Sequence, residues 1–470
     1  MKLTTTLLTV AFATVSFGQA TWSTYAAQPT SNEQAGPIGF DGSGEVCVLG
    51  SYGNATTTGL ELLAFSPTTG AFQWKFDIAA PSSWFDLPQD VVFRGNNFYG
   101  LANEYNNAVG TISDRILVIK GHVTSGTAVL DWAVRLSPNS AWKANGNRLD
   151  VSPNESYVDI AGDIHVNSSG TTDERAYYAR MNASTGAVVY SGTQANGAGN
   201  VDISNGPNSM PRAKTGVGVI SGNTSMYFIS NLKRTAPPFF ANVNVTKFSN
   251  TGTTLSSYQN DSTNAFRQHY SRAYTSTLDI NGEVSAIYMT GHQQNSNQGT
   301  DYNYCAPTIS LGTTSGIALI SEVYYRHQNS TSMYHDMSGI YHDQSGNYVT
   351  GLSTRGSLVG QPLGVSAFAS PPEWATTLIR TYETGTDHLH SDPNYRAFDG
   401  LSGTITTLTS QINAGPSTLN LLTTGGGRTI ANHSGFLPGG SKVGSGGAGF
   451  YALTQQTGVG DLDVALVRIN

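Results

Sequence analysis

A short pattern that recurs along the whole chain limits what this sequence can fold into. Its clearest copy, residues 341–351, has an Asp, a small polar turn, a run of alternating side chains and a Gly (YHDQSGNYVTG). Other copies start at Asp41, Asp150, Asp279 and Asp399. Asp, Ser, Asn and Gly favour tight turns, and alternating aromatic and β-branched residues favour strands. Each copy therefore predicts a strand, a tight turn and a second strand.

A second hairpin follows each copy of this pattern. It consists of an apolar run, a Thr-Gly or Ser-Gly turn and a strand with an aromatic residue, such as Trp74, Trp132 or Tyr190. The turn glycines are Gly70, Gly126, Gly186, Gly252 and Gly316, which are 56, 60, 66 and 64 residues apart. Two hairpins make a four-stranded unit, and repetition of such a unit at this period is typical of a β-propeller.

The number of units follows from the strands that end the first hairpin. Eight such strands are centred near Val48, Tyr99, Tyr157, Tyr227, Tyr288, Tyr348, Ile405 and Tyr451. The pattern favours an all-β propeller of about eight four-stranded blades. Seven blades are the alternative if the weak seventh or eighth copy is not a full blade.

The two ends of the chain fit the same repeat. The last residues, 463–469, match the third strand of a unit and then stop, so that unit lacks its fourth strand. Residues 21–25 (TWSTY) match an aromatic fourth strand and precede the first copy. We therefore expect the N-terminal strand to pair with the C-terminal blade, which closes the ring and covers a sheet edge. No charged or Pro-rich linker divides residues 21–470, which predicts a single domain.

The first 20 residues predict export. They carry Lys2, an apolar run and Gly18-Gln19-Ala20, which fits a secretory signal peptide; a short buried helix is the alternative. No later stretch reaches the ~20 consecutive apolar residues of a membrane span. We expect a protein that is secreted or held at the cell surface, with the periplasm as the alternative. Cys47 and Cys305 belong to the first and fifth units, so we expect them to be unpaired.

Composition excludes several classes of protein. Charged residues are 12% of the chain, about half of the usual ~25%. The net charge is -7 and there is no basic run, so we expect no nucleic-acid partner. Aromatic residues at 10% and regular alternation argue against a disordered chain.

The repeat resembles that of the secreted bacterial β-propeller (SBBP-like) family. Residues 343–351 (DQSGNYVTG) and 463–469 (DVALVRI) carry this resemblance best. It implies a propeller and export, but no one activity, because a fold does not specify a function.

Candidate site residues lie in the segments that connect each outermost strand to the next innermost strand. We expect these loops to share one face around the channel mouth, where function usually sits. Ligand-binding candidates are Trp84, Trp142, His269, Tyr334, His335, Asp336, His388 and His390. Catalytic candidates are His335, Tyr270 and Arg267. In the alternative interpretation, the aromatic residues pack between blades and the histidines are solvated.

The first functional hypothesis is binding of an extracellular glycan or protein through these loops. A polysaccharide lyase or hydrolase with a His/Tyr/Arg site at the channel mouth is the second, and a structural envelope or matrix component is the third. We predict no cofactor, with a divalent metal near the His and Asp residues as the alternative. We expect a monomer. Neither a Gly-x-Ser-x-Gly elbow nor a Gly-Lys-Ser/Thr phosphate loop is present in the sequence.

Overall fold

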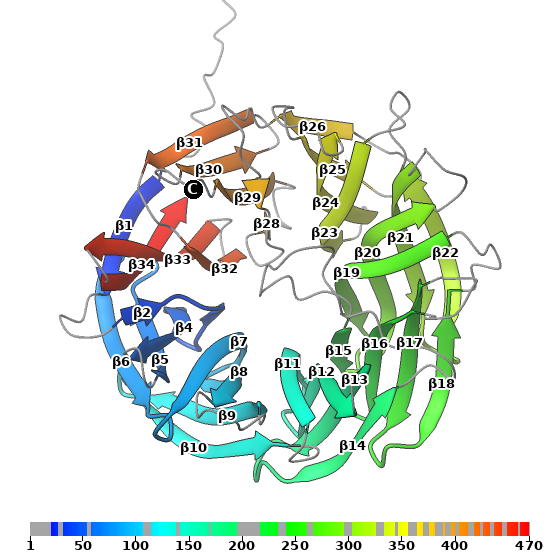
Figure 1. Ribbon diagram of the computed structural model, residues 1–470, viewed down its shortest axis with the longest axis horizontal. Helices are drawn as coiled ribbons and strands as arrows, with labels where there is room; N and C mark the ends of the chain where they lie inside the picture. The colour runs from blue at the N-terminus through cyan, green and yellow to red at the C-terminus, as the bar shows by residue number, and fades with distance from the viewer. Residues whose placement is uncertain are drawn as a thin grey trace, which may run out of the picture.

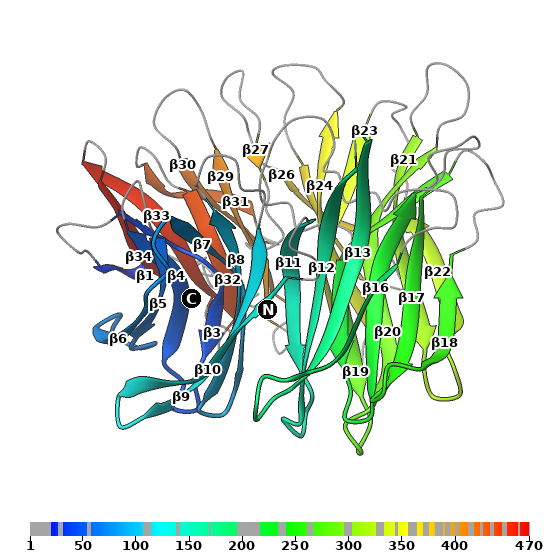
Figure 2. The same ribbon diagram turned by 60° about the horizontal axis from the view of Figure 1, so that its bottom comes forward.

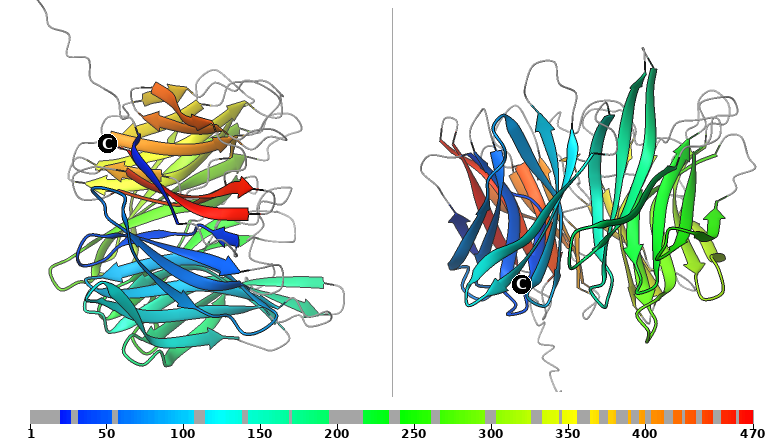
Figure 3. Two further views of the ribbon diagram at one scale, coloured as in Figure 1. Left: turned by 90° about the vertical axis from the view of Figure 1, so that its left-hand side faces the viewer. Right: turned by 90° about the horizontal axis from the view of Figure 1, so that it is seen from below.

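The chain forms antiparallel sheets that follow one another around a ring. The computed structural model describes residues 20–26, 32–53, 58–106, 114–137, 142–168, 171–194, 217–233, 241–260, 267–295, 303–325, 333–343, 346–355, 364–369, 376–380, 389–390, 396–399, 404–411, 418–423, 426–432, 437–443, 449–458 and 461–469. These residues contain strands and no helix. In Figure 1 the sheets succeed each other in chain order, from blue to red, and Figures 2 and 3 show the same ring from other sides. This is the arrangement of a β-propeller.

Four sheets in the middle of the chain each have four strands in sequence order. They are β11 (Trp142–Val151), β12 (Tyr157–Ser168), β13 (Thr171–Asn182) and β14 (Val188–Gln194); β15 (Val217–Ser221), β16 (Ser225–Lys233), β17 (Ala241–Ser249) and β18 (Thr254–Gln259); β19 (Arg267–Leu278), β20 (Val284–Asn295), β21 (Asn303–Gly312) and β22 (Ala318–Tyr325); β23 (Met333–Asp343), β24 (Gly346–Arg355), β25 (Gly364–Ala369) and β26 (Thr376–Arg380). The predicted unit of two hairpins is confirmed in these sheets.

The first sheet is larger because two units are joined in it. It contains β2 (Asn32–Gln34), β3 (Ile38–Phe40), β4 (Val46–Gly53), β5 (Thr58–Phe65), β6 (Phe72–Ile78), β7 (Trp84–Arg94), β8 (Asn97–Asn106), β9 (Arg115–Thr124) and β10 (Thr127–Leu136). A single parallel pair, Thr58 with Phe85, links β5 to β7. The thin link separates two groups of strands that otherwise follow the repeat.

The last two sheets also follow the chain. One contains β27 (Leu389–His390), β28 (Arg396–Asp399), β29 (Thr404–Gln411), β30 (Thr418–Thr423) and β31 (Gly426–Asn432), with both β27 and β28 paired to β29. The other has the order β1 (Ala20–Ala26), β34 (Asp461–Ile469), β33 (Gly449–Gly458) and β32 (Leu437–Val443). The first strand is antiparallel to the last, with Trp22 opposite Arg468 and Ser23 opposite Val467. In Figure 1, blue β1 accordingly lies beside red β34.

The predicted turn residues are confirmed at two copies of the first hairpin and corrected at a third. The Asp41 carboxylate accepts hydrogen bonds from the backbone N–H groups of Ser43 (3.0 Å) and Glu45 (2.9 Å). Asp279 accepts the equivalent bonds in its own turn. In the copy at Asp150 the turn residue is Ser152, whose Oγ accepts the N–H of Tyr157 (3.0 Å). Asp150 lies in β11 and accepts the N–H of Ser221 in the next sheet (2.8 Å) instead.

The turn glycines of the second hairpin are confirmed by their backbone conformation. Their φ angles are 72° at Gly70, 75° at Gly126, 71° at Gly186, 82° at Gly252 and 125° at Gly316. Glycine reaches this region without the steric cost that other residues meet. The spacing of these glycines therefore marks the same turn in successive units.

Aromatic residues of one sheet cover the turn glycine of the next. The Trp132 indole in β10 donates to the carbonyl of Ala183 (3.1 Å), and its ring lies against Gly186. Tyr190 in β14 lies against Gly252 in the same way. Neighbouring sheets also share apolar cores, since Tyr99 and Val118 pack in one cluster with Ile160.

Gly186→Ala is expected to destabilise the protein more than Gly126→Ala. Both glycines have similar positive φ, so each alanine costs about 1–2 kcal/mol. A methyl group at Gly186 would lie 2.8 Å from Val134 Cγ2 and 3.0 Å from the Trp132 ring, whereas nothing lies within 4 Å at Gly126. Crowding should add about 1–3 kcal/mol at Gly186 alone. Denaturant unfolding of both variants measures the difference, and equal losses would contradict the proposed contact between sheets.

Cys47 is a free thiol buried in β4, so it is not bonded to Cys305. Burial raises the pKa of the Cys47 thiol well above its usual value. Among the described residues, no helix is long and apolar enough to cross a membrane.

Candidate functional site

The structure places the predicted site residues at the beginnings of inner strands. Trp84 is the first residue of β7, and Trp142 is the first residue of β11. The start of β19 contains Arg267, His269 and Tyr270, and the start of β23 contains Tyr334, His335 and Asp336. His390 lies in β27. His388 lies outside the described residues, and of the candidate side chains only that of Trp84 is described. We expected these segments to be loops. That prediction is wrong for the described residues, because cross-strand pairing extends to them, as in Trp84 opposite Asn106.

A recurrent irregularity separates these first residues from the rest of each inner strand. The register shifts between Pro88 and Asp90 in β7, Gly146 and Arg148 in β11, Ser271 and Ala273 in β19, Met337 and Gly339 in β23, and Pro438 and Gly440 in β32. Such bulges bend a strand and change the direction of its side chains. The candidate residues of β7, β11, β19 and β23 thus occupy one segment of the repeat, before the bulge.

Trp84 is held in a defined orientation by its neighbours. The backbone N–H of Trp84 donates to the carbonyl of Pro81 (3.1 Å), and Ser83 before it has a φ of 68°, which is unusual for a residue other than glycine. The Arg115 guanidinium lies 3.6 Å from the centre of the indole ring. This cation–π contact fixes one face of a side chain that is only half-buried.

Two arginines share one buried carboxylate beneath Trp84. The Glu104 side chain in β8 is fully buried and accepts from Arg115 Nε (2.8 Å) and Arg135 Nε (2.8 Å). The two arginine side chains are 24% and 33% exposed. Arg115 begins β9 and Arg135 lies near the end of β10, so the three side chains gather at the end of the sheet where β7 starts.

Asp86 is a second buried carboxylate at this end of the sheet. It is 1% exposed and lies directly opposite Glu104 in the register of β7 and β8. Neither of its carboxylate oxygens has a hydrogen-bond partner among the described residues. Burial, and then the charge of Glu104, raise the pKa of Asp86 to about 7. Its backbone is fixed by Thr58, whose Oγ accepts the Asp86 N–H (3.0 Å).

A related group of charges lies across the link between β5 and β7. Glu61 in β5 is fully buried and pairs with Lys75 Nζ (2.9 Å), which also pairs with Asp77 (3.2 Å). Burial raises the pKa of Glu61 to about 7, although Lys75 opposes this shift. Lys75 also lies 4.8 Å from the centre of the Tyr52 ring. The two groups give this end of the first sheet an unusual concentration of buried carboxylates.

Sequence reasoning missed Glu61, Glu104, Arg115 and Arg135. A signal was present at Glu61, which interrupts the apolar run 60–65 (LELLAF) in a chain with few charged residues. Glu or Asp is almost never fully buried without a partner. The partners come from other strands, however, so the sequence alone does not pair them.

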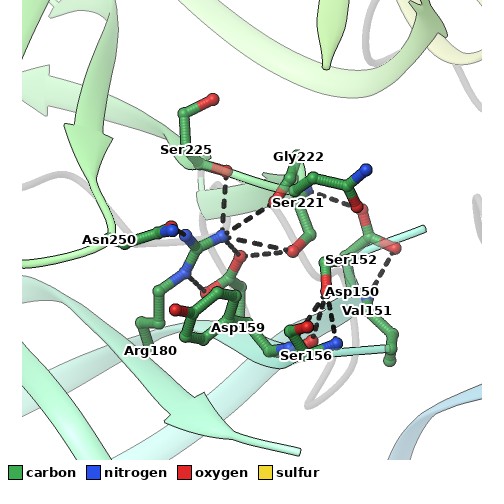
Figure 4. Close-up of polar contacts among 12 residues, drawn as sticks. Asp150, Val151, Ser152, Ser156, Asp159, Arg180, Ser221, Gly222, Ser225 and Asn250 are labelled. Atoms are coloured by element: carbon green, nitrogen blue, oxygen red, sulfur yellow. Dashed lines mark hydrogen bonds and ion pairs between the residues drawn. The ribbon is translucent and has the colours of Figure 1, made fainter. Parts of the chain in front are cut away.

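A third buried charge network connects two sheets nearer their other end. Arg180 in β13 makes two hydrogen bonds to Asp159 in β12, at 2.7 and 2.6 Å, and both side chains are fully buried. Figure 4 shows the guanidinium between Asp159 and the next sheet, where it donates to the carbonyl of Ser225 (2.8 Å). Ser221 Oγ donates to Asp159 (2.5 Å). Every charge here has a partner, which indicates a structural role.

The described residues contain no group of three or more His, Cys, Asp or Glu side chains that could hold a metal ion. The predicted alternative of a metal near His335 or His390 concerns side chains outside this set.

No family model and no curated protein matches the chain. Solved structures with a similar arrangement include a periplasmic gluconolactonase of Pseudomonas aeruginosa (TM-score 0.44, 10% identity, 86% of this chain and 96% of that one). Others are the polysaccharide lyase Uly1 (TM-score 0.43, 10% identity, 94% and 90%) and the β-propeller domain of the trilobed protease from Pyrococcus furiosus (TM-score 0.40, 8% identity, 81% and 93%). At these TM-scores the likeness indicates no shared activity.

Proposed function

We propose that this protein is an exported binding protein that recognises an extracellular glycan through the end of the ring where the inner strands begin. The observation that carries the proposal is Trp84, a half-buried indole held by a guanidinium 3.6 Å from its ring centre. An aromatic ring in a fixed orientation is suited to stack on the apolar face of a sugar at little entropic cost.

We also propose eight blades, export and membership of the SBBP-like family. The nine-stranded sheet divides at the single pair Thr58–Phe85 into two repeat units, which with the other six sheets makes eight. The antiparallel pairing of β1 with β34 supports a ring closed by the N-terminal strand. The proposed signal peptide would be removed near Ala20, where β1 begins. The final location, outside the cell, on its surface or in the periplasm, and the monomeric state belong to the same proposal.

The second candidate function is that of a polysaccharide lyase or hydrolase. The pKa values of about 7 at Asp86 and Glu61 favour it, since groups that titrate near neutral pH suit acid–base catalysis. Both carboxylates are almost fully buried, which favours binding as the first choice. The catalytic candidates His335, Tyr270 and Arg267 remain part of this alternative.

A panel of immobilised polysaccharides tests the proposal directly. We expect retention of the protein without release of reducing or unsaturated ends. Trp84→Ala should weaken retention by about 10-fold or more, as truncation of a central aromatic contact usually does. Phe72→Ala is the matched control, because Phe72 is 48% exposed in β6, just after the Gly70 turn.

Each outcome of the panel separates the candidate functions. If the protein releases reducing or unsaturated sugar ends and His335→Ala abolishes this release, the protein is an enzyme and the binding proposal is wrong. Failure of every polysaccharide to retain the protein would contradict a glycan ligand and favour an envelope or matrix role.

A further inference from the structure

The pair Arg115 and Arg135 carries more positive charge than its buried partner neutralises. Both guanidinium groups contact the single carboxylate of Glu104. Asp86 faces them from β7, but no hydrogen bond or ion pair joins it to either arginine among the described residues. The charges of both arginines act on Asp86, but Glu104 is the one carboxylate to which they are hydrogen-bonded among the described residues.

The contacts leave most of each guanidinium group unused. Both arginines bind Glu104 through Nε. Their Nη groups make no hydrogen bond to any residue that the structure describes. An arginine has five N–H donors in a planar fork that matches carboxylate and sulfate groups. Glu104 is fully buried, whereas the side chains of Arg115 and Arg135 are 24% and 33% exposed.

We propose that Arg115, Arg135 and Trp84 form a subsite for an anionic sugar residue, the carboxylate or sulfate group of an acidic polysaccharide. The inference rests on the proposed glycan-binding function and names its ligand class. The anionic group is bound by the Nη donors of the two arginines, through charge-assisted hydrogen bonds. The pyranose ring that carries this group stacks on Trp84, whose orientation Arg115 already fixes. Glu104 holds both arginines in place and does not contact the ligand.

A structural role for the pair would not require this arrangement. One arginine is enough to neutralise Glu104, and neither arginine is hydrogen-bonded to Asp86, the other carboxylate nearby. A bound anion gives the second arginine a hydrogen-bonded counter-ion.

Affinity measurements with three soluble polymers test the proposal. The probes are polygalacturonate, which carries carboxylates, dextran sulfate, which carries sulfate esters, and neutral dextran. We expect the wild-type protein to bind one or both anionic polymers at least about 10-fold more tightly than dextran, because the ion pairs add to the stacking contact. Preference for polygalacturonate would assign the site to uronic acids, and preference for dextran sulfate to sulfated sugars.

Arginine-to-lysine variants locate the site while keeping the charge beside Glu104. Arg115→Lys and Arg135→Lys should each weaken anionic binding about 5- to 10-fold, because lysine lacks the planar fork. Arg94→Lys, at the other end of β7, is the matched control and should change nothing. Should a lysine variant fail to fold, the double variant Glu104→Gln/Arg115→Gln removes one charge of each sign and should show the same loss of anionic binding.

The outcomes keep this inference distinct from the proposed function. Equal binding of dextran and the anionic polymers, with no effect of the arginine variants, would overturn the anionic subsite and leave glycan binding intact. Anionic binding that Arg94→Lys weakens as much as Arg115→Lys would also overturn it, since the charge effect would then be nonspecific. Failure of all three polymers, together with no retention on the polysaccharide panel, would remove both.

Discussion

Replacing Arg180 by methionine is expected to lower the free energy of unfolding by about 3–5 kcal/mol, because it leaves an unpaired charge in the interior. The Arg180 and Asp159 side chains are both fully buried. Removal of the guanidinium takes two hydrogen bonds from Asp159, leaving it the single bond from Ser221 Oγ. It also removes the contact with the Ser225 carbonyl across the sheet interface. Urea unfolding followed by tryptophan fluorescence measures the loss.

Two further variants separate charge from packing at this position. Asp159→Asn in the Arg180→Met background should recover about half of the lost stability or more, since no buried charge then remains. Arg94→Met is the comparison at a more exposed site: the side chain is 37% exposed, its ion pair with Asp150 contributes about 0–1 kcal/mol, and its hydrogen bond to the Val151 carbonyl about 1 kcal/mol more. If Arg180→Met cost no more than Arg94→Met, the buried network would contribute nothing to the joining of the sheets.

Asp86→Asn is expected to stabilise the protein at alkaline pH and to have little effect near pH 4. Burial raises the pKa of Asp86 to about 7, above the ~3.9 of an aspartate in an unfolded chain. Between these values the native state holds a proton that the unfolded state has lost, so stability falls as the pH rises through the window. The full difference between the two pKa values corresponds to about 4 kcal/mol in the free energy of unfolding. Asparagine does not ionise and removes this pH-dependent loss.

Melting temperatures from pH 4 to pH 8.5 test this second prediction. We expect the free energy of unfolding of the variant to exceed that of the wild type by about 2–4 kcal/mol at pH 8 and to approach it at pH 4. The groups that interact electrostatically with Asp86 stay the same in both proteins: Tyr52, Glu104, Arg115 and Arg135. Glu61 titrates in the same range, so both proteins keep part of the pH dependence. Parallel pH profiles would show that Asp86 ionises as an ordinary surface carboxylate does.

The fold was predictable where a structural requirement selects one type of residue. A turn with positive φ selects glycine, so Gly126, Gly186 and Gly252 mark the repeat in the printed sequence. An aspartate that accepts two backbone N–H groups is selected almost as strongly, as at Asp41 and Asp279. These requirements are local, and the order of strands in each sheet follows from them.

The joining of strands into one sheet was not predictable in the same way. The pair Thr58–Phe85 depends on how two units approach each other, and no local pattern encodes it. The extension of β7 to Trp84 depends on its pairing partner Asn106 in β8. The sequence analysis predicted a loop there because the segment connects the outermost strand of one unit to the innermost strand of the next.

The candidate site was predictable only in its aromatic part. Trp84 was visible because large aromatic residues recur at the same point of successive units. The charges beneath it were not, since Glu104, Arg115 and Arg135 belong to three strands and meet only in the folded register. A single arginine in a strand carries no sign that a second one shares its carboxylate.

The pairing of the first strand with the last sets an order for the folding of the chain. Residues 20–26 are synthesised before all other described residues, yet their partners in 461–469 are made after all other described residues. Closing a loop of this length has a high entropic cost, and contacts so distant in sequence form slowly. The repeats between β1 and β34 can fold as they are synthesised, but β1 has an unpaired edge until β34 has been made. A chain that stops short of β34 would therefore leave β1 without its partner strand, with a sheet edge open to association with other molecules.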